Sequence, residues 1–338
     1  MQIQNLRCEY LTNPLSVENK CPLLSWELQS PERGKKQTAY RILAASSLSL
    51  LNEKEADYWD SGIVKTDQSV QIKYKGKDLS SRQKIHWKVM VWDENNQPIP
   101  WSDTATWSMG LLNAKDWTAG WITHMEDMYP DSAITFPAPF FRKGFLLDKQ
   151  VKQAKVYICG LGFYEMYLNG QKVGTQVLAP AVTNYDKRTI QRILYFYDDQ
   201  SSQRALYNTF DVTELLDKGN NTIGVILGNG WYNQRDRTIE GCMWYNTPRL
   251  LLQMEVVYSD GSVQTIQTDH TWRCTTGPIL HDAIFTGEIY DARREPGNWH
   301  SNGYDDNHWK QALLCQPPSG KLYPQLAPFD EITRTLKP

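Results

Sequence analysis

The sequence lacks long apolar runs and has no excess of charge of one sign. Of its 338 residues, 41% are hydrophobic and 22% are charged, and the formal net charge is −2. No apolar run approaches the roughly eighteen residues that a membrane-spanning helix requires. A balanced charge also creates no field that would hold the phosphates of a nucleic acid. We therefore expect neither a membrane nor a nucleic acid as partner, and a length that suits about two or three domains.

Cysteine and histidine are few and scattered. The six cysteines form no C-x-x-C pair and the six histidines form no H-E-x-x-H motif, so a zinc site has no support. Only Cys8 and Cys21 lie close enough in sequence to suggest a disulfide, and free buried thiols are the simpler interpretation. The first residues, MQIQNLRCEY, lack the basic and apolar regions of a signal peptide, so the compartment stays open.

Aromatic residues are abundant by contrast. The chain contains 13 tryptophans and 18 tyrosines, more than its cores should need. Both side chains combine an apolar ring with a polar group, which suits a position between core and solvent. Some of these rings are therefore expected at the surface.

Short alternating runs fill the first third of the chain. Between residues 23 and 109 they recur at intervals of roughly ten to twenty residues, separated by turns such as SPERGKK and DENNQPIP. In KIHWKVMVWD, every second residue from 85 to 91 is apolar and lies on one face, as in a half-buried strand. About a hundred residues with some seven strands are typical of a fibronectin type III-like sandwich, which we place at residues 1–111.

The rest of the chain also has the pattern of β-structure. In KVYICGLGFYEMYLNGQKVG, two alternating segments meet at Asn169-Gly170, where both residues can adopt the positive φ of a type I′ turn. Another tight hairpin is expected at Asp260-Gly261. The one convincing helical turn is VTELLDKGN, with Thr213 as its N-cap.

These signals predict an all-β fold. A larger antiparallel sandwich, a jelly roll, should follow the first domain at residues 112–325. Prolines are frequent near the end of the chain, so residues 326–338 are expected to form an extended connector.

The turn GNGWYN at residues 228–233 has two open interpretations. It lacks the G-x-G-x-x-G pattern and a surrounding βαβ unit, so a phosphate site is excluded by context. In the structural interpretation, Gly228 and Gly230 bend the strand and Trp231 fills the end of the core. In the functional one, Trp231 and Tyr232 form a stacking surface for a sugar at the rim of the sandwich. The nearby side chains that would bind hydroxyl groups are Asn229, Asn233 and Arg235.

Acidic residues gather in three places. YDDQ at 197–200 and YDDNHW at 304–309 offer oxygen ligands of the kind that calcium accepts, but neither has the length of an EF-hand loop. Glu288 and Asp291 are the nearest pair for glycosidase chemistry. On an extended strand they would be ~10 Å apart and on opposite faces. We expect them instead to pair with Arg293 and Arg294 and to hold a long loop.

Several motifs resemble one known enzyme family. LRCEYLTNPLSVENKCPLLSWEL, HWKVMVWDENN and WSMGLLNAKDWTAGWI are similar to the fibronectin-like N-terminal module of bacterial α-L-rhamnosidases, glycoside hydrolase family 78. AKVYICGLGFYEMYLNGQKVG, LAPAVTNYDKR and FTGEIYDARREPGNW resemble the jelly-roll domain that follows it in those enzymes. The resemblance runs from about residue 6 to residue 338, with the motifs in the same order.

The resemblance implies an enzyme region without catalytic residues of its own. The family hydrolyses terminal α-L-rhamnosides with carboxylates of an (α/α)₆ barrel that carries a D-C-P-x-R-D-E-R-type motif, which is absent here. The implied partners are the C-terminal catalytic domain of the same bacterial enzyme and a rhamnose-containing glycan. The periplasm is favoured over the cytoplasm as the compartment.

The resemblance also indicates where a sugar would bind. In some relatives the jelly roll binds rhamnose with the help of calcium, which makes calcium the one cofactor to consider here, with its ligands left open. The candidate carbohydrate-binding residues are Asn184, Tyr185, Asp186, Asn229, Trp231, Tyr232, Arg235 and Trp244. Two interpretations remain: a weak carbohydrate-binding or assembly region with an exposed aromatic platform, or a structural spacer whose aromatic residues pack inward or against the catalytic domain. Solvent exposure of the tryptophans distinguishes them.

Overall fold

The chain folds into two compact units in a computed structural model. It describes residues 1–125, 136–186, 202–234 and 243–337, without the side chains of Met243 and Trp244. The first unit is Met1–Trp117 and the second is Thr118–Pro338. Both consist of strands joined by loops and three short 3-10 turns within the described residues, which confirms the prediction of an all-β fold.

The first unit is a sandwich of two small sheets. One sheet has the strand order β1–β2–β6 and the other has the order β4–β3–β7–β8, with β5 paired to β3. The strand bounds are β1 (Gln2–Cys8), β2 (Leu23–Gln29), β3 (Ala39–Ala45), β4 (Trp59–Asp60), β5 (Val64–Lys65), β6 (Ile72–Lys73), β7 (Lys84–Trp92) and β8 (Ala105–Ser108). The 3-10 turn η1 (Ala114–Asp116) ends the unit.

The alternation in the sequence of β7 has the predicted result. Ile85, Trp87, Val89 and Val91 are all fully buried, whereas the residues between them are partly exposed. Burying each such side chain contributes about 1.5–3 kcal/mol relative to leaving it in water. This strand therefore anchors the core of the first unit, in which Trp87 and Trp107 make an edge-to-face contact at 6.4 Å.

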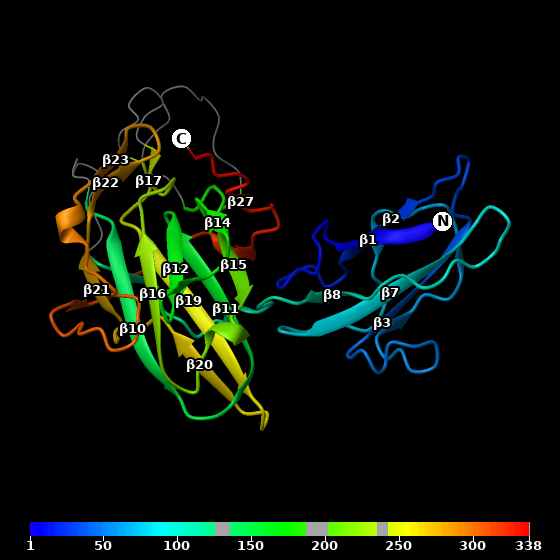
Figure 1. Ribbon diagram of the computed structural model, residues 1–338, viewed down its shortest axis with the longest axis horizontal. Coiled ribbons are helices and arrows are strands. Elements are labelled where there is room, and N and C mark those ends of the chain that lie inside the picture. Colours follow the sequence, from blue (N-terminus) through cyan, green and yellow to red (C-terminus); the bar gives the residue numbers. More distant parts are fainter. Residues whose placement is uncertain (126–135, 187–201, 235–242, 338) are drawn as a thin grey trace. The chain divides into compact units, whose positions relative to one another are not determined.

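The second unit is a larger two-sheet sandwich (Figure 1). The six-stranded sheet has the order β13 (Gln171–Lys172), β12 (Tyr164–Leu168), β16 (Gly219–Leu227), β10 (Pro139–Leu147), β21 (Arg273–Thr276), β24 (Lys310–Gln311). The seven-stranded sheet has the order β25 (Leu313–Leu314), β9 (Ile122–Thr123), β19 (Arg249–Tyr258), β11 (Val151–Leu161), β15 (Arg204–Asp211), β26 (Lys321–Pro324), with β20 (Val263–Gln267) paired to β19. All of these pairings are antiparallel except that of β15 with β26.

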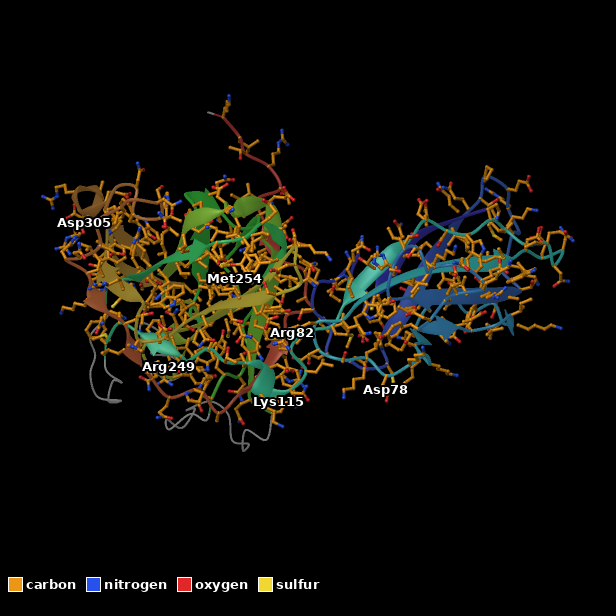
Figure 2. All side chains as sticks on the ribbon, turned by 90° about the horizontal axis from the view of Figure 1, so that it is seen from below. Asp78, Arg82, Lys115, Arg249, Met254 and Asp305 are labelled. Carbon is orange, nitrogen blue, oxygen red and sulfur yellow. The ribbon has the colours of Figure 1, made fainter. Side chains whose placement is uncertain are left out.

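The core of the second unit lies between the two sheets. Phe141 of β10 and Val225 of β16 face it from one sheet, and Ile158 of β11 and Met254 of β19 face it from the other. Figure 2 shows Met254 in the midst of the side chains of this unit. These long central strands carry continuous apolar runs because the sandwich buries most of their length.

Three two-stranded ladders lie at one end of this sandwich, drawn uppermost in Figure 1. They are β14 (Gln176–Val177) with β27 (Asp330–Glu331), β17 (Asn233–Gln234) with β18 (Met243–Trp244), and β22 (Ile279–Ala283) with β23 (Gly287–Tyr290). The 3-10 turn η3 (Ala292–Arg294) follows β23. This end of the sandwich includes the turn GNGWYN and most of the candidate site residues.

Two of the turns predicted from the sequence are confirmed, and a third differs from its prediction. Asn169 and Gly170 both have positive φ, 50° and 88°, and join β12 to β13 as predicted. The hairpin at Asp260-Gly261 is confirmed between β19 and β20. The expected helical turn is only the 3-10 turn η2 (Thr213–Leu215), and the prediction of Thr213 as N-cap is wrong because Val212 occupies that position. The Thr213 hydroxyl oxygen instead accepts a hydrogen bond from the amide of Ala154 at 2.9 Å.

Two predicted absences can be compared with the described residues. The five cysteines in the described part of the chain are free, including Cys8 and Cys21. In the same part of the chain, no helix is long and apolar enough to cross a membrane.

Candidate functional site

The glycines of the turn GNGWYN allow two backbone segments to touch. Gly162 has a φ of 121°, and a Cβ atom there would overlap the carbonyl oxygen of Gly228. Gly230 has a φ of 48°, and a Cβ atom there would lie 2.7 Å from the amide nitrogen of Phe163. The amide of Gly228 donates to the carbonyl oxygen of Phe163 at 2.7 Å. The turn therefore packs directly onto the segment between β11 and β12.

Tyr232 fills the interior behind this turn. Its ring stacks on Tyr245 at 5.5 Å and meets Tyr185 edge-on at 5.6 Å. Tyr185 is 2% exposed and Tyr232 is fully buried. Tyr232 is thus not at the rim of the sandwich, where the sequence placed it, because its ring turns inward and closes this end of the core. A buried ring presents no face on which a sugar could stack.

Asn184 joins the same group of tyrosines. Its side-chain oxygen accepts a hydrogen bond from the hydroxyl group of Tyr245 at 3.0 Å. Asp186, two residues later, accepts a hydrogen bond from the amide of Ser319 at 3.2 Å. Asn184, Tyr185 and Tyr232 therefore lie together in the structure. Asp186 instead binds a loop that is distant in the sequence. Arg235 and the side chain of Trp244 lie outside the described residues.

Trp231 points away from the tyrosines. Its ring is half-buried and meets Phe285, on the turn of the β22–β23 hairpin, edge-on at 5.9 Å. The structural interpretation expected Trp231 to fill the end of the core, and this expectation is wrong because its neighbour Tyr232 does so. Trp231 is therefore the one member of the predicted aromatic platform with a described side chain that is partly open to solvent.

Asn229 attaches the β22–β23 hairpin to the turn. Its amide donates to the Asp282 carboxylate at 2.7 Å, and its side-chain nitrogen donates to the other carboxylate oxygen at 2.9 Å. Its side-chain oxygen accepts a hydrogen bond from Asn233 at 2.7 Å. Asn229 is only 4% exposed. The backbone amide and the side-chain amide of Asn229 therefore both make hydrogen bonds within the protein.

Asp282 is a half-buried acid that the sequence did not reveal. Burial raises the pKa of its carboxyl group, and the hydrogen bonds from Asn229 lower it by less than this rise. The charge of Glu288 raises the pKa of Asp282 further. In the sequence, ILHDAIF contains no motif around Asp282, and its partner Asn229 is 53 residues away. Sequence alone offered no signal for this pair.

A cavity of about 600 Å³ opens between the hairpin and the edge of the sandwich. We call it the hairpin hollow. Its walls come from the β11–β12 connection, the end of β14, the end of β16 and both strands of the hairpin. The lining residues used below are Leu178, Ile284, Tyr290, Glu165, Asp282 and Glu288.

The three carboxylates of the hollow have different surroundings. Glu165 accepts hydrogen bonds from Lys172 at 2.6 Å and from the hydroxyl group of Tyr167 at 2.7 Å. Burial raises its pKa, but these two bonds outweigh that effect and lower it. Glu288 is exposed and lies directly opposite Asp282 in the ladder. The hollow therefore combines apolar walls with two neighbouring acids, Asp282 and Glu288, on the hairpin side.

Asp291 has the predicted role in a loop. It binds the Arg293 guanidinium through two contacts of 2.7 and 2.8 Å and lies 3.8 Å from Arg294. It also accepts a hydrogen bond from the Arg293 amide and so caps η3. Glu288, the other acid of the predicted pair, lines the hollow instead.

The described acids near residue 305 do not suit calcium. Asp306 pairs with the buried guanidinium of Arg142, and Asp305 accepts a hydrogen bond from the amide of Asn307. A cation would have to displace the arginine from the carboxylate. Across the described residues, no group of three or more His, Cys, Asp or Glu side chains could hold a metal ion. The other predicted turn, at residues 197–200, lies outside the described residues.

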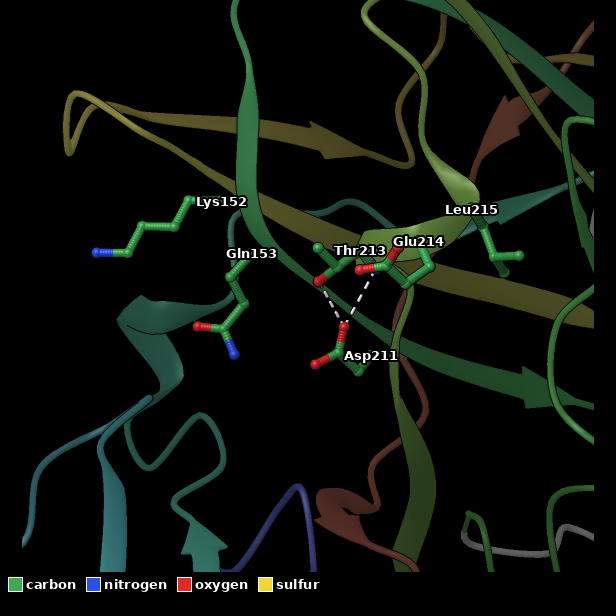
Figure 3. A pocket seen from close by; sticks show the side chains of 6 residues that line it. All are labelled: Lys152, Gln153, Asp211, Thr213, Glu214 and Leu215. Atoms are coloured by element: carbon green, nitrogen blue, oxygen red, sulfur yellow. Dashed lines mark hydrogen bonds between the residues drawn. The ribbon is translucent and has the colours of Figure 1, made fainter. Parts of the chain in front are cut away.

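A second, shallower hollow of about 480 Å³ lies beside η2. Figure 3 shows Asp211 beneath Thr213, with Lys152 and Gln153 on the neighbouring strand. Asp211 accepts hydrogen bonds from the Thr213 amide, at 3.1 Å, and from its hydroxyl group, at 2.5 Å. Because Asp211 is already hydrogen-bonded within this turn, this hollow presents fewer groups that could bind a ligand than the hairpin hollow does.

In comparisons with known proteins, each of the two units matches a family model. The family model for the α-L-rhamnosidase N-terminal domain matches residues 149–334, and the model for the Rha78A-like, N-terminal immunoglobulin domain matches residues 3–113. Fibronectin type III and immunoglobulin domains share the sandwich architecture that the sequence predicted.

Relatives agree in sequence and in structure. An α-L-rhamnosidase from Formosa agariphila is 38% identical over 339 residues, which cover 94% of this chain and 34% of the relative. The solved α-L-rhamnosidase from Dictyoglumus thermophilum is 40% identical, with a TM-score of 0.85 over all of this chain and 37% of its own. That from Aspergillus terreus is 30% identical, with a TM-score of 0.80 over 95% of this chain and 35% of its own.

The chain therefore spans about a third of the length of these relatives. The matched models, the order of the two units and the similarity over nearly the whole chain all agree. This chain belongs to the α-L-rhamnosidase N-terminal domain family.

Proposed function

We propose that this chain is the non-catalytic N-terminal region of a bacterial α-L-rhamnosidase and that its jelly-roll unit serves the assembly of the whole enzyme. The observation that carries the proposal is that family models match both units, while the chain covers only about a third of the rhamnosidases it resembles. The catalytic carboxylates would then belong to the other two thirds.

Asp282 and Glu288 of the hairpin hollow do not have the arrangement of a glycosidase pair. Such a pair flanks the scissile bond from two sides. Asp282 and Glu288 are cross-strand neighbours, so their Cβ atoms are about 4.5–5.5 Å apart on the same wall. Asp282 is also held by two hydrogen bonds from Asn229. This geometry supports a role for the hairpin other than bond cleavage.

A hydrolysis assay tests the proposal. The purified chain is incubated with a nitrophenyl α-L-rhamnoside, with a full-length rhamnosidase as positive control. We expect no nitrophenol above the background rate. Turnover by the chain alone that disappears in both Asp282→Asn and Glu288→Gln would overturn the non-catalytic assignment and place the chemistry in the hollow.

Weak glycan binding by the jelly roll is the second candidate function. It is favoured by Trp231, which is half-buried beside Phe285 and whose neighbour Gly230 lines the hairpin hollow. The tryptophans as a group support packing more than binding, because none of those with a described side chain is exposed. The surplus of aromatic residues reaches the surface as tyrosine and phenylalanine, for example at Tyr290 and Phe285.

Tryptophan fluorescence separates the two candidates. The chain is titrated with L-rhamnose in the presence and absence of calcium. If the jelly roll binds the sugar near Trp231, emission changes and saturates, and Trp231→Phe abolishes the change. The matched control is Trp59→Phe, a half-buried tryptophan of the first unit, which should leave the titration unaltered. If the emission of the wild-type chain does not change on titration, glycan binding is contradicted and assembly remains as the candidate role.

A further inference from the structure

The rim of the hairpin hollow exposes several large apolar side chains. Leu178 is 59% exposed, Phe285 is 46% exposed and Tyr290 is 48% exposed. Ile284, at 37%, adds to the same surface. They come from two separate elements, the end of β14 and the β22–β23 hairpin. Leu178, Ile284 and Tyr290 line the hollow, and Phe285 follows Ile284 on the turn of the hairpin. Contiguous exposed apolar surface of this kind marks contact sites for other macromolecules.

Leu178 is unfavourable in two ways if this surface stays open to water. It exposes most of an apolar side chain, and its φ of 52° lies in the left-handed region. That region disfavours residues with a Cβ atom and is adopted more readily by glycine or asparagine. Strained positions of this kind occur where a surface has a function. A leucine gains from being here if another apolar surface covers it.

Charge indicates what kind of surface would cover the hollow. Asp282 and Glu288 are directly opposite each other in the β22–β23 ladder and both line the cavity. Like charges at opposed positions destabilise a ladder. A basic side chain, and an arginine in particular because it can bind two carboxylates, would offset this repulsion. The complementary surface is therefore apolar with a basic group.

The path of the chain indicates where that surface comes from. Val177, the residue before Leu178, pairs with Asp330 of β27, the last strand in the described residues. In the relatives, about two thirds of the polypeptide lies outside the matched part. Residues 332–337 follow β27, so polypeptide beyond them would be tethered through a few residues to the strand that pairs with Val177, next to Leu178. A short tether gives such a segment a high effective concentration there.

We propose that the hairpin hollow is the docking surface for the remaining two thirds of a full-length rhamnosidase, which fills it with apolar side chains and one basic side chain. This inference rests on the proposed function as an N-terminal region. It adds the surface through which assembly occurs, and it uses Leu178, Phe285 and Tyr290 as contact residues and Asp282 with Glu288 as the charged partners.

The experiment compares one substitution in two contexts. The first is this chain alone. The second is a joined enzyme, in which this chain is followed by the two thirds of the Formosa agariphila relative that it does not match. In the chain alone, Leu178→Asn should raise the Tm by about 2 °C, because asparagine tolerates the left-handed backbone and the leucine is exposed. In the joined enzyme the same substitution should lower the Tm, because it removes a covered apolar contact.

Leu146→Asn is the matched control. Leu146 is also 59% exposed but lies on β10 and does not line the hollow. Its substitution should shift the Tm equally in both contexts. An equal shift for Leu178→Asn in both contexts would overturn the docking proposal, and so would saturable binding of L-rhamnose in the hollow that protects Tyr290 from solvent. Neither result touches the non-catalytic assignment, which fails only if the chain alone hydrolyses a rhamnoside.

A second measurement applies if the joined enzyme does not fold. The exposed areas of the side chains aligned with Leu178, Phe285 and Tyr290 are measured in the solved chain from Dictyoglumus thermophilum, with and without its unmatched two thirds. We expect those two thirds to cover more than half of the area at these positions and none of it at the position aligned with Leu146. Equal exposure with and without them would contradict the proposal.

Discussion

Asp282 and Glu288 are opposed partners in the antiparallel ladder between β22 and β23. Nothing in the sequence indicates that they are neighbours, yet the pair places two carboxylates side by side on the wall of a cavity. Burial raises the pKa of Asp282, and the charge of Glu288 adds to this rise. The repulsion between Asp282 and Glu288 lowers the folding stability of the isolated chain, and contact with a basic side chain would offset this loss.

Removing the charge of Glu288 should stabilise the second unit at neutral pH. Glu288→Gln is expected to raise the free energy of unfolding at pH 7 by about 0.5 kcal/mol, the scale of an opposed cross-strand pair. Since the folded-state pKa of Asp282 lies above its ordinary value, its stabilising contribution is complete below that ordinary value. It is lost as the pH rises through the folded-state pKa. The gain from Glu288→Gln should therefore vanish toward about pH 3, where Asp282 is protonated in both the folded and the unfolded state and no longer repels a neighbouring charge.

Urea denaturation at the two pH values measures this difference. Glu288→Asp, which keeps the charge, is the control and should show no comparable gain at pH 7. A gain of equal size at both pH values would contradict the electrostatic explanation.

Arg142 holds the loop after η3 to the six-stranded sheet. Its side chain is 6% exposed, pairs with Asp306 and donates to the carbonyl oxygen of Trp299 at 2.8 Å. It donates to the carbonyl oxygen of Ser301 at 3.1 Å as well. Arg142→Met would leave Asp306 without its buried partner, so we expect a loss of about 3–5 kcal/mol in the free energy of unfolding.

An exposed arginine in the same region provides the control for that variant. Arg293 pairs with Asp291 but its side chain is 90% exposed. Arg293→Met should cost less than about 1 kcal/mol, as is usual for surface ion pairs. Similar losses for the two variants, measured by denaturation, would show that Arg142 does not hold the loop as described.

Gly162 should be far less tolerant of a side chain than another glycine of similar φ. Gly162 and Gly219 have φ values of 121° and 109°. A Cβ atom at Gly219 meets nothing within 4 Å, whereas one at Gly162 overlaps the carbonyl oxygen of Gly228. Gly219→Ala should cost about 1–2 kcal/mol for its backbone conformation alone. Gly162→Ala should cost several kcal/mol more, and equal losses in thermal denaturation would contradict the close contact.

The sequence predicted those features that depend on neighbouring residues. The hairpin at Asn169-Gly170 follows from the φ preferences of two adjacent residues, and the buried face of β7 follows from an alternation of period two. Asp291 with Arg293 was predictable for the same reason, since they are only two positions apart in the sequence. The properties of neighbouring residues are sufficient to predict each of these features.

Contacts between distant segments were not predictable in this way. Tyr185, Tyr232 and Tyr245 pack together only because β16 and the segment after β14 meet at one end of the sandwich. The direction of a ring at a strand end is equally hidden, so the inward turn of Tyr232 and the half-buried position of Trp231 were not predictable. The family resemblance supplied the domain order, and it could not supply which rings turn inward.

Amide hydrogen exchange of the β22–β23 hairpin tests the central claim most directly, since it needs no substitution. Exchange at residues 279–290 is compared in this chain alone and in the joined enzyme, with residues 258–263 at the β19–β20 turn as an internal reference. If the hairpin hollow is an assembly surface, exchange at 279–290 slows roughly tenfold or more on joining, which corresponds to about 1.4 kcal/mol, while the reference is unchanged. Equal exchange of the hairpin in both proteins would contradict the account.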